Sequence, residues 1–265
     1  MADYTVGFCQ FAPLRSDVAA NIERVESLLA DTSADLLVLP ELANSGYMYA
    51  SPAHLAPYAE PGDGSGPFLS AVRGFARRTG ALIVAGFAEH AGSVLYNSAV
   101  AVSEDGVLAV YRKTHLFFNE KDLFSPGDTG FVVLDHRGVR TGIMICFDWY
   151  FPESARTLVL RGAQIIAHPS NLVLPHCQTA MVTRSLENRV FSITCNRYGT
   201  EDLDGQTLTF TGQSQALATK GERLIQAPVE GDCVAVVEID PARAKDKQAT
   251  VRNHLLNERR PEMYA

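Results

Sequence analysis

The chain has few cysteines and no cysteine pattern, which excludes several classes of protein. Its 265 residues include five cysteines, an odd number, at widely scattered positions. No pair has C-x-x-C spacing and no histidine–cysteine cluster has zinc spacing, so we expect neither a disulfide framework nor a metal site. Scattered free cysteines are typical of a reducing compartment, and a cytoplasmic location is the simplest expectation.

Positive charge and long apolar runs are also scarce. Lysine and arginine total 23 against 30 aspartates and glutamates, a net charge of −7. Without a basic stripe, this balance argues against nucleic acid or an anionic membrane as a partner. No apolar stretch approaches the ~20 residues that span a bilayer. The beginning, "MADYTVGFCQFAP", lacks the basic and apolar regions of a signal peptide.

Short apolar runs rich in β-branched residues alternate with amphipathic segments along the chain. Apolar spacing predicts helices over 17–30, 67–80, 152–162 and 179–190. An Asp-Gly pair at 105–106 predicts a hairpin over 95–113, and a turn near 137–138 predicts another over 130–146. Further strands are expected over 4–9, 35–40, 81–87, 163–169, 191–196, 213–219, 222–228 and 233–239.

This order of elements favours an α/β fold. A continuous apolar strand such as "DLLVLP" at 35–40 needs cover on both faces. Each half of the chain runs through strands and helices to hairpin-like strand pairs, so two packed sheets with helices outside both are expected. No low-complexity linker divides the chain, and we predict one domain over 1–265 whose polar residues 249–265 form a C-terminal tail.

Three reactive residues follow apolar strands. Glu41 follows "LLVLP", Lys113 ends "VLAVYRK" and Cys146 ends "GIMIC". Side chains from several strands converge at strand ends in α/β folds. A thiol nucleophile, a carboxylate base and an ammonium group near the oxyanion are the parts that acyl transfer requires. The backbone N–H of Phe147 is the expected second donor to the oxyanion.

Each of these residues also has a structural interpretation. A free cysteine on a strand is usually a buried, inert residue, so position alone does not make Cys146 a nucleophile. His115 or His168 could form a Cys–His pair instead. We interpret His115 as a structural residue near Lys113, and His168 as a residue that hydrogen-bonds locally.

Three segments resemble the catalytic segments of the nitrilase superfamily of carbon–nitrogen hydrolases: "LLVLPEL", "YRKTHLF" and "GIMICFDWYFPESAR". The likeness extends to "LYNSAV", "SPGDTGF", "HPSN" and "RSLENRV". It implies Glu41 as general base, Lys113 as oxyanion stabiliser and Cys146 as nucleophile, and we expect Cys146 to mark a sharp turn off the strand "GIMI". Glu120 matches a second glutamate that positions the substrate or the lysine.

The resemblance also implies a fold and an assembly. The expected fold is a four-layer αββα sandwich of two mixed sheets with helices outside. The resemblance implies no metal and no organic cofactor. It further implies a homodimer or higher homo-oligomer, with helices in 152–162 and 179–190 at the interface and the tail at 249–265 contacting a partner subunit.

The resemblance favours a small, aliphatic-amidase-like enzyme. We predict hydrolysis of a small-molecule, non-peptide amide through a cysteine thioester, with release of ammonia. Phe117, Phe118, Trp149 and Tyr150 are candidate pocket residues. The alternatives are an N-carbamoyl amine amidase of the N-carbamoylputrescine type, a nitrilase, and a catalytically silent scaffold of the same fold. "CFD" in place of the Cys-Trp-Glu of true nitrilases argues against the nitrilase.

Overall fold

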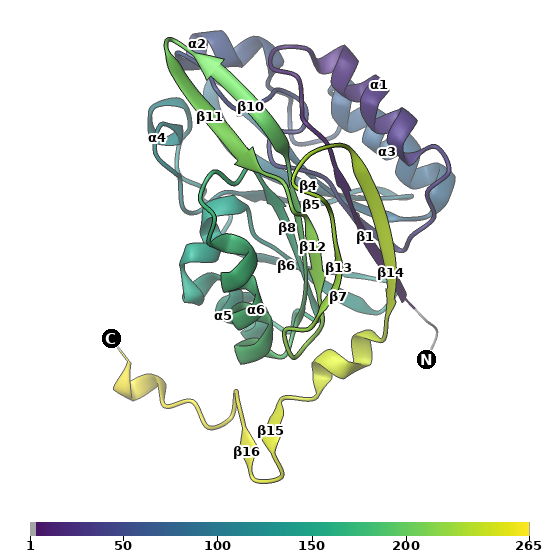
Figure 1. Cartoon of the computed structure of the whole chain (residues 1–265), viewed down its shortest axis with the longest axis vertical. Helices are drawn as coiled ribbons and strands as arrows, with labels where there is room; N and C mark the ends of the chain where they lie inside the picture. Colours follow the sequence, from purple (N-terminus) through teal and green to yellow (C-terminus); the bar gives the residue numbers. More distant parts are fainter. Residues whose placement is uncertain (1–3, 265) are drawn as a thin grey trace.

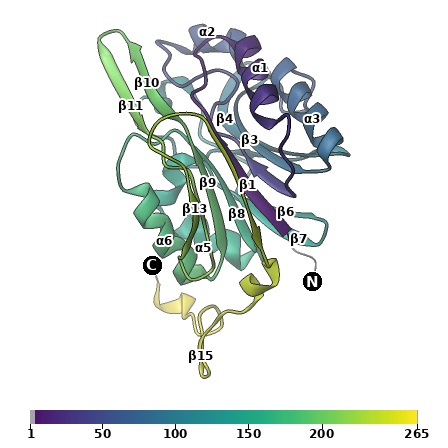
Figure 2. The ribbon, with the colours of Figure 1, turned by 45° about the vertical axis from the view of Figure 1, so that its right-hand side comes forward.

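Two six-stranded mixed β-sheets, packed face to face, form the centre of the molecule (Figures 1 and 2). The computed structural model describes residues 4–264. The first sheet has the order β14 (Cys233–Ile239), β1 (Tyr4–Gln10), β2 (Leu36–Val38), β3 (Leu82–Ala91), β4 (Val94–Ser103), β5 (Gly106–Arg112). The second has the order β13 (Arg223–Gln226), β12 (Gln215–Leu217), β9 (Phe191–Asn196), β8 (Ile165–Ser170), β7 (Val139–Ile143), β6 (Val132–His136).

Helices cover the outer faces of both sheets, as Figure 2 shows. The first sheet carries α1 (Val18–Leu29) and α3 (Pro67–Thr79), and the second carries α5 (Pro152–Leu160) and α6 (Cys177–Asn188). The side chain of Asp17 caps α1, and left-handed Gly80 ends α3, as the sequence signals predict. The four-layer αββα sandwich is therefore confirmed.

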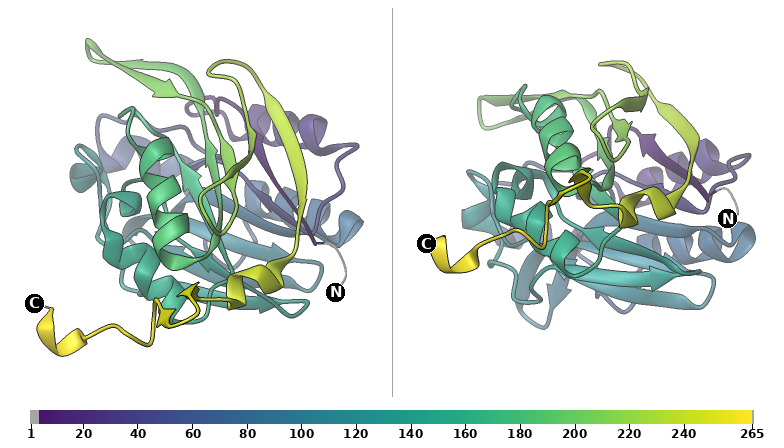
Figure 3. Two further views of the ribbon diagram at one scale, coloured as in Figure 1. Left: turned by 60° about the horizontal axis from the view of Figure 1, so that its bottom comes forward. Right: turned by 90° about the horizontal axis from the view of Figure 1, so that it is seen from below.

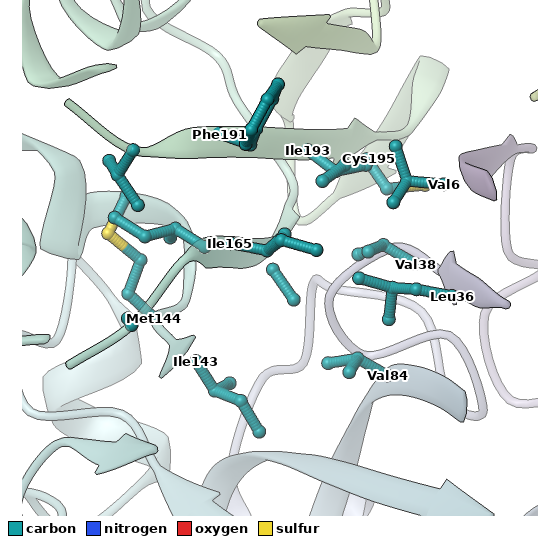
Figure 4. Close-up of a cluster of buried hydrophobic side chains, with 14 of the residues drawn as sticks. Val6, Leu36, Val38, Val84, Ile143, Met144, Ile165, Phe191, Ile193 and Cys195 are labelled. Carbon is teal, nitrogen blue, oxygen red and sulfur yellow. The ribbon is translucent and has the colours of Figure 1, made fainter. Parts of the chain in front are cut away.

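Alternation along the strands explains why the sheets are covered twice. In β2, Leu36 and Val38 face the second sheet, whereas Leu37 packs under α1 and α3. Figure 4 shows Leu36, Val38 and neighbouring side chains of the first sheet opposite Ile165 and Ile193 of the second. All four of these inter-sheet residues are fully buried. The apolar run at 35–40 is thus a strand with two buried faces, as expected.

The predicted hairpins at 105–106 and 137–138 are present as β4–β5 and β6–β7. A further hairpin, which the strand pattern did not predict, pairs β10 (Tyr198–Leu203) with β11 (Gln206–Thr211). Its turn contains Asp204 and Gly205, both with positive φ. The Asp-Gly pair is the same signal that predicted the β4–β5 hairpin, so this element was detectable in the sequence.

Three shorter elements complete the body: the helices α2 (Pro52–Leu55) and α4 (Glu120–Leu123) and the 3₁₀ turn Ala56–Tyr58. Beyond β14, the tail passes through the 3₁₀ turn Pro241–Lys245, the small ribbon β15 (Gln248–Thr250) and β16 (Asn253–His254), and the 3₁₀ turn Pro261–Met263. Figure 3 shows the tail, in yellow, leading away from the two sheets. Its contact with a partner subunit stays a prediction. Within residues 4–264, no helix has the length and apolar character that a membrane crossing requires.

Candidate active site

Cys146 lies at a sharp bend between the second sheet and a 3₁₀ helix. β7 ends at Ile143, and Cys146–Tyr150 form the 3₁₀ helix. The sharp turn expected at Cys146 is therefore present, whereas the strand "GIMI" ends two residues earlier than expected. The cause is Asp148, whose carboxylate accepts a hydrogen bond from the Ile145 N–H at 2.8 Å and turns the chain off the sheet. Cys146 has a φ of +41°, a left-handed conformation that costs a non-glycine residue about 1–3 kcal/mol.

Buried hydrogen bonds hold Cys146 in this conformation. The His168 ring nitrogen Nε2 lies 2.9 Å from the carbonyl oxygen of Cys146, and its Nδ1 lies 3.0 Å from the Thr194 hydroxyl. The ring therefore donates to the backbone of the bend and not to the thiol. His168 thus stabilises the backbone at Cys146. Within the described residues, the alternative of a Cys146–His168 catalytic pair has no hydrogen bond in its favour.

Asp148 also joins the bend to the segment that carries Lys113. Its fully buried carboxylate accepts from the Tyr111 hydroxyl at 2.7 Å, from the His115 backbone N–H at 3.2 Å and lies 2.7 Å from His115 Nδ1. Tyr111 and His115 flank Lys113 on both sides. The His115 ring stacks on Phe151 at 3.8 Å, so His115 has the structural role that we expected.

Lys113 lies between two carboxylates at the end of β5. Its Nζ is 2.6 Å from Glu41 Oε1 and 2.7 Å from both carboxylate oxygens of Glu120. All three residues are buried. Burial by itself lowers the pKa of Lys113. The charges of Glu120 and Glu41 raise this pKa by more than burial lowers it, so the net shift is upward. Lys113 is therefore an ammonium group that is held by two predicted catalytic acids.

Glu41 has one occupied and one free carboxylate oxygen. Oε1 accepts from Lys113 and from the Asn97 side chain at 2.7 Å, whereas Oε2 is buried and has no hydrogen-bond partner among residues 4–264. The backbone carbonyl of Glu41 accepts from Asn171 Nδ2 at 2.9 Å. A buried carboxylate oxygen without a hydrogen-bond partner costs folding free energy unless a ligand binds it. Oε2 is therefore the Glu41 oxygen that is free to accept a further hydrogen bond.

The surroundings of Cys146 favour the neutral form of its thiol. Burial raises its pKa most strongly, the charge of Glu41 raises it further, and Lys113 opposes both. The net direction is well above the ordinary cysteine value. A neutral thiol needs a base at the moment of attack. Among the neighbouring charges Glu41 affects the pKa of the thiol most, so Glu41 remains the predicted base.

Glu120 is held by three groups besides its own helix. Tyr47 donates its hydroxyl to Oε1 at 2.7 Å, the Phe117 N–H donates to Oε2 at 3.1 Å, and Lys113 contacts both oxygens. Burial raises the pKa of Glu120, Lys113 lowers it and Glu41 raises it, with an upward net direction. Burial also raises the pKa of Tyr47, so its hydroxyl stays a donor.

Sequence reasoning did not single out Tyr47, Asn97 or Asn171. The signal for two of them was present, because Asn97 lies in "LYNSAV" and Asn171 ends "HPSN", both part of the family likeness. Tyr47 lies in a loop with no periodic pattern, six residues after Glu41.

Two cavities that share Phe117 as a lining residue lie near these side chains. The one in front of the thiol has a volume of about 10 Å³, room for about one water molecule, and is lined by Phe117, Cys146, Phe147, Trp149, Asn171, Leu172, Val173 and Leu174. A larger outer cavity of about 250 Å³ is lined by residues that include Tyr47, Phe117, Phe118 and Glu120. Of the four predicted pocket aromatics, Phe117 lines both cavities, Trp149 the inner one and Phe118 the outer one. Tyr150 is 53% exposed and lines neither.

The site spans the boundary between the two sheets. Glu41 and Lys113 extend from β2 and β5 of the first sheet, and Cys146 follows β7 of the second. Asn171, just past β8 of the second sheet, reaches across to the backbone of Glu41. The candidate catalytic side chains therefore meet only because the sheets pack together. Within residues 4–264, no group of three His, Cys, Asp or Glu side chains is arranged to hold a metal ion.

Gly86 on β3 is required for the placement of Glu41. A Cβ atom there would lie 2.4 Å from the Glu41 Cα, so Gly86→Ala must displace the backbone that carries Glu41. We expect a loss of about 10²-fold in kcat/KM, because small displacements of catalytic groups are costly, and of about 1–3 kcal/mol in stability. Gly74→Ala in α3 is the matched control, because nothing lies within 3.7 Å of its Cβ. Full activity in Gly86→Ala would contradict this account.

His168 makes stability depend on pH. Burial lowers the pKa of His168 from 6.5 to about 4, so the folded protein holds the ring neutral. Its contribution is present above pH 6.5 and is lost as the pH falls toward 4. The loss amounts to about 3 kcal/mol at most. Chemical unfolding between pH 4 and 7 is expected to show a shallower pH dependence for His168→Gln than for the parent or for His54→Gln, an exposed-histidine control. An equal pH dependence of the unfolding free energy in His168→Gln and in the parent would contradict this prediction.

Comparison with known proteins identifies relatives over the whole chain. The family model "Carbon-nitrogen hydrolase" matches residues 5–248. A protein of Pyrococcus abyssi named "Nitrilase" is 43% identical over 98% of both chains. A Pseudomonas "(R)-stereoselective amidase" is 37% identical over 87% of this chain and 83% of its own. Among solved structures, a carbon–nitrogen hydrolase from Helicobacter pylori has a TM-score of 0.85 at 26% identity, over 99% and 97% of the two chains.

Proposed function

The chain belongs to the carbon–nitrogen hydrolase family, and we propose that it is an amidase that cleaves a small, non-peptide amide through a thioester on Cys146. The observation that carries the proposal is the buried Lys113 between Glu41 and Glu120, with one Glu41 oxygen free and with all three charges near enough to Cys146 to affect the pKa of its thiol. A structural ion pair needs one carboxylate, whereas acyl transfer uses both a base and a charged donor to the oxyanion, and the second carboxylate can hold that donor.

The first half-reaction forms the thioester. Glu41 Oε2 takes the proton of the Cys146 thiol while the sulfur forms a bond with the amide carbonyl carbon. The oxyanion that develops accepts hydrogen bonds from Lys113 Nζ and from the Phe147 N–H, which belongs to the first turn of a 3₁₀ helix and so has no partner within that helix. The protonated Glu41 then gives its proton to the nitrogen, the C–N bond breaks, and ammonia leaves.

The second half-reaction uses the same groups in reverse. Glu41, again a carboxylate, takes a proton from water as the water oxygen bonds to the thioester carbon. The C–S bond breaks, the proton returns to the sulfur, and the carboxylic acid leaves. The net reaction is amide plus water giving a carboxylic acid and ammonia. In this scheme Glu120 stays outside the proton transfers and holds Lys113.

The cavities support a short acyl group. The inner cavity of about 10 Å³ leaves little room beside the thiol, so an amide longer than a few atoms must extend past Phe117 into the outer cavity. Phe117 lines both spaces. We therefore propose short aliphatic or ω-amide substrates whose carbonyl lies at Cys146 and whose remaining atoms lie in the outer cavity.

Ammonia release from a panel of substrates tests the proposed reaction. Primary aliphatic amides, N-carbamoyl amines and nitriles are each incubated with the purified protein. Turnover of the amides, giving ammonia and the matching acid, is the expected result. Ammonia together with carbon dioxide from the carbamoyl compounds alone would replace the proposal with the carbamoyl amidase alternative. Turnover of nitriles alone would replace it with a nitrilase like the relative from Pyrococcus abyssi.

A silent scaffold of the same fold is the non-enzymatic alternative. It predicts no turnover of any compound in the panel and no alkylation of Cys146 by iodoacetamide in the folded protein. Mass spectrometry of the labelled protein distinguishes Cys146 from the other four cysteines. The complete set of Glu41, Lys113, Glu120 and Cys146 favours the enzyme.

A further inference from the structure

We infer that Glu201, a carboxylate on the unpredicted β10–β11 hairpin, is a positioning residue that acts on Glu120 through Tyr47. The inference rests on the proposed amidase function and adds a residue to it. Neither Glu201 nor its hairpin carries a motif that the sequence links to the reaction. The hairpin extends from the second sheet's side of the body, where Figures 1 and 2 show it beyond the ends of the core strands.

Glu201 anchors the loop that follows Glu41. Its carboxylate accepts from the Tyr47 N–H at 3.1 and 3.2 Å and from the Met48 N–H at 2.7 Å. Glu201 is only 7% exposed, and Tyr47 lies 154 residues earlier in the chain. A buried carboxylate that accepts two backbone N–H groups fixes the backbone at that point. The loop thus takes its position from the hairpin.

Arg197 completes this anchor. Its guanidinium is 2% exposed and forms an ion pair with Glu201. The same guanidinium lies 4.1 Å from the centre of the Phe210 ring on β11. The edge of that ring meets Tyr47, with 5.7 Å between ring centres and an interplanar angle of 82°. The hairpin therefore holds Tyr47 twice: by its backbone through Glu201 and by its ring through Phe210.

Tyr47 connects this anchored loop to the predicted catalytic groups. Its hydroxyl donates to Glu120 Oε1 at 2.7 Å, and Glu120 contacts Lys113 Nζ at 2.7 Å. Each residue in this series of contacts, from Glu201 through Tyr47 and Glu120 to Lys113, is less than 9% exposed, so no solvent competes for these bonds. If the Tyr47 backbone moves, its hydroxyl leaves Glu120, and Lys113 loses part of its fixed geometry.

A double-mutant cycle separates this role from a purely structural one. Glu201→Gln is expected to lower kcat on the best amide about tenfold, and Tyr47→Phe, which removes only the hydroxyl, by a similar factor. Because Glu201 acts through that hydroxyl, the double variant is expected to have the kcat of Tyr47→Phe alone. Thermal unfolding is measured on all four proteins, because a merely structural role would lower stability in both backgrounds without this kinetic coupling.

Matched variants make the outcome decisive. Asp202→Asn removes the neighbouring acid, which is exposed on the same strand, and is expected to leave kcat unchanged. If Glu201→Gln fails to fold, Phe210→Leu replaces it, because it releases the Tyr47 ring and keeps both charges. A kcat effect that is equally large in the Tyr47→Phe background, or no kcat effect, overturns the inference. Activity in the parent and none in Cys146→Ala keep the amidase proposal independent of this result.

Discussion

Replacement of Cys146 by alanine is expected to lower kcat/KM for the best amide by at least about 10³-fold, with the fold retained. The sulfur is the atom that forms the thioester, and no other thiol can replace it, because the other four cysteines lie outside the cavity in front of Cys146. The backbone of the bend does not depend on the side chain. It is held by Asp148 and His168, which bond to the backbone at Ile145 and Cys146.

Steady-state ammonia release and circular dichroism are the measurements for this variant. Cys177→Ala is its control, since Cys177 is a fully buried cysteine of α6. The control is expected to lose stability, by about 1–3 kcal/mol as for other deletions of a buried group, and to keep its activity. Residual turnover within tenfold of the parent in Cys146→Ala would remove the thioester mechanism, whatever the fold of that variant.

Lys113→Met is expected to lose both activity and stability. Removal of the ammonium leaves Glu41 and Glu120 buried without their shared counter-charge, which costs about 3–5 kcal/mol. The oxyanion also loses its charged donor, and kcat is expected to fall about 10²–10³-fold. Urea unfolding at pH 7 and steady-state kinetics measure the two effects separately.

The pH dependence of Lys113→Met has a definite sign. The pKa of Glu120 is already raised above its ordinary 4.5 by burial, and Lys113 lowers it, so removal of Lys113 raises it further. An acid whose pKa is higher in the folded state stabilises the fold at low pH and loses that contribution as the pH rises above 4.5. The variant is therefore expected to regain stability relative to the parent as the pH falls from 7 toward 4.5.

Lys247 offers a matched control for this experiment. It is a second buried lysine, 8% exposed, whose Nζ donates to the carbonyls of Asn188 and Arg189 at the end of α6. Lys247→Met is expected to destabilise the protein and to keep kcat, without the gain at low pH. If both lysine variants lose kcat equally, Lys113 is a structural residue and not an oxyanion stabiliser.

The sheets and the three reactive strand ends could be predicted because they depend on local pattern. The run at 35–40 has apolar residues on both faces of a strand, and an apolar core on each side is its only stable environment. Glu41, Lys113 and Cys146 each follow such a strand. Their convergence was expected from topology, and the contacts of Lys113 with Glu41 and Glu120 agree with it.

Other features could not be predicted, because they depend on tertiary contacts. The family likeness led us to expect a turn at Cys146 but not its cause, which is that Asp148 accepts a hydrogen bond from a backbone N–H three residues earlier. Tyr47 and Glu201 are 154 residues apart, and neither has a pattern that points to the other. The Asp-Gly signal at 204–205 predicts a hairpin, but nothing in it predicts that the hairpin holds a loop next to Glu41.

The division of the candidate site between two sheets links activity to the contact between them. Glu41 and Lys113 belong to one sheet and Cys146 to the other, and the interface is apolar, as in Figure 4. A partly melted state that keeps each sheet but loosens the side chains between them retains its far-ultraviolet spectrum. In such a state the Cys146 thiol and the Lys113 ammonium are no longer held in a fixed position relative to each other. Heating is therefore expected to inactivate the enzyme before its secondary structure melts. Turnover should detect the loss of packing between the sheets at a lower temperature than circular dichroism does.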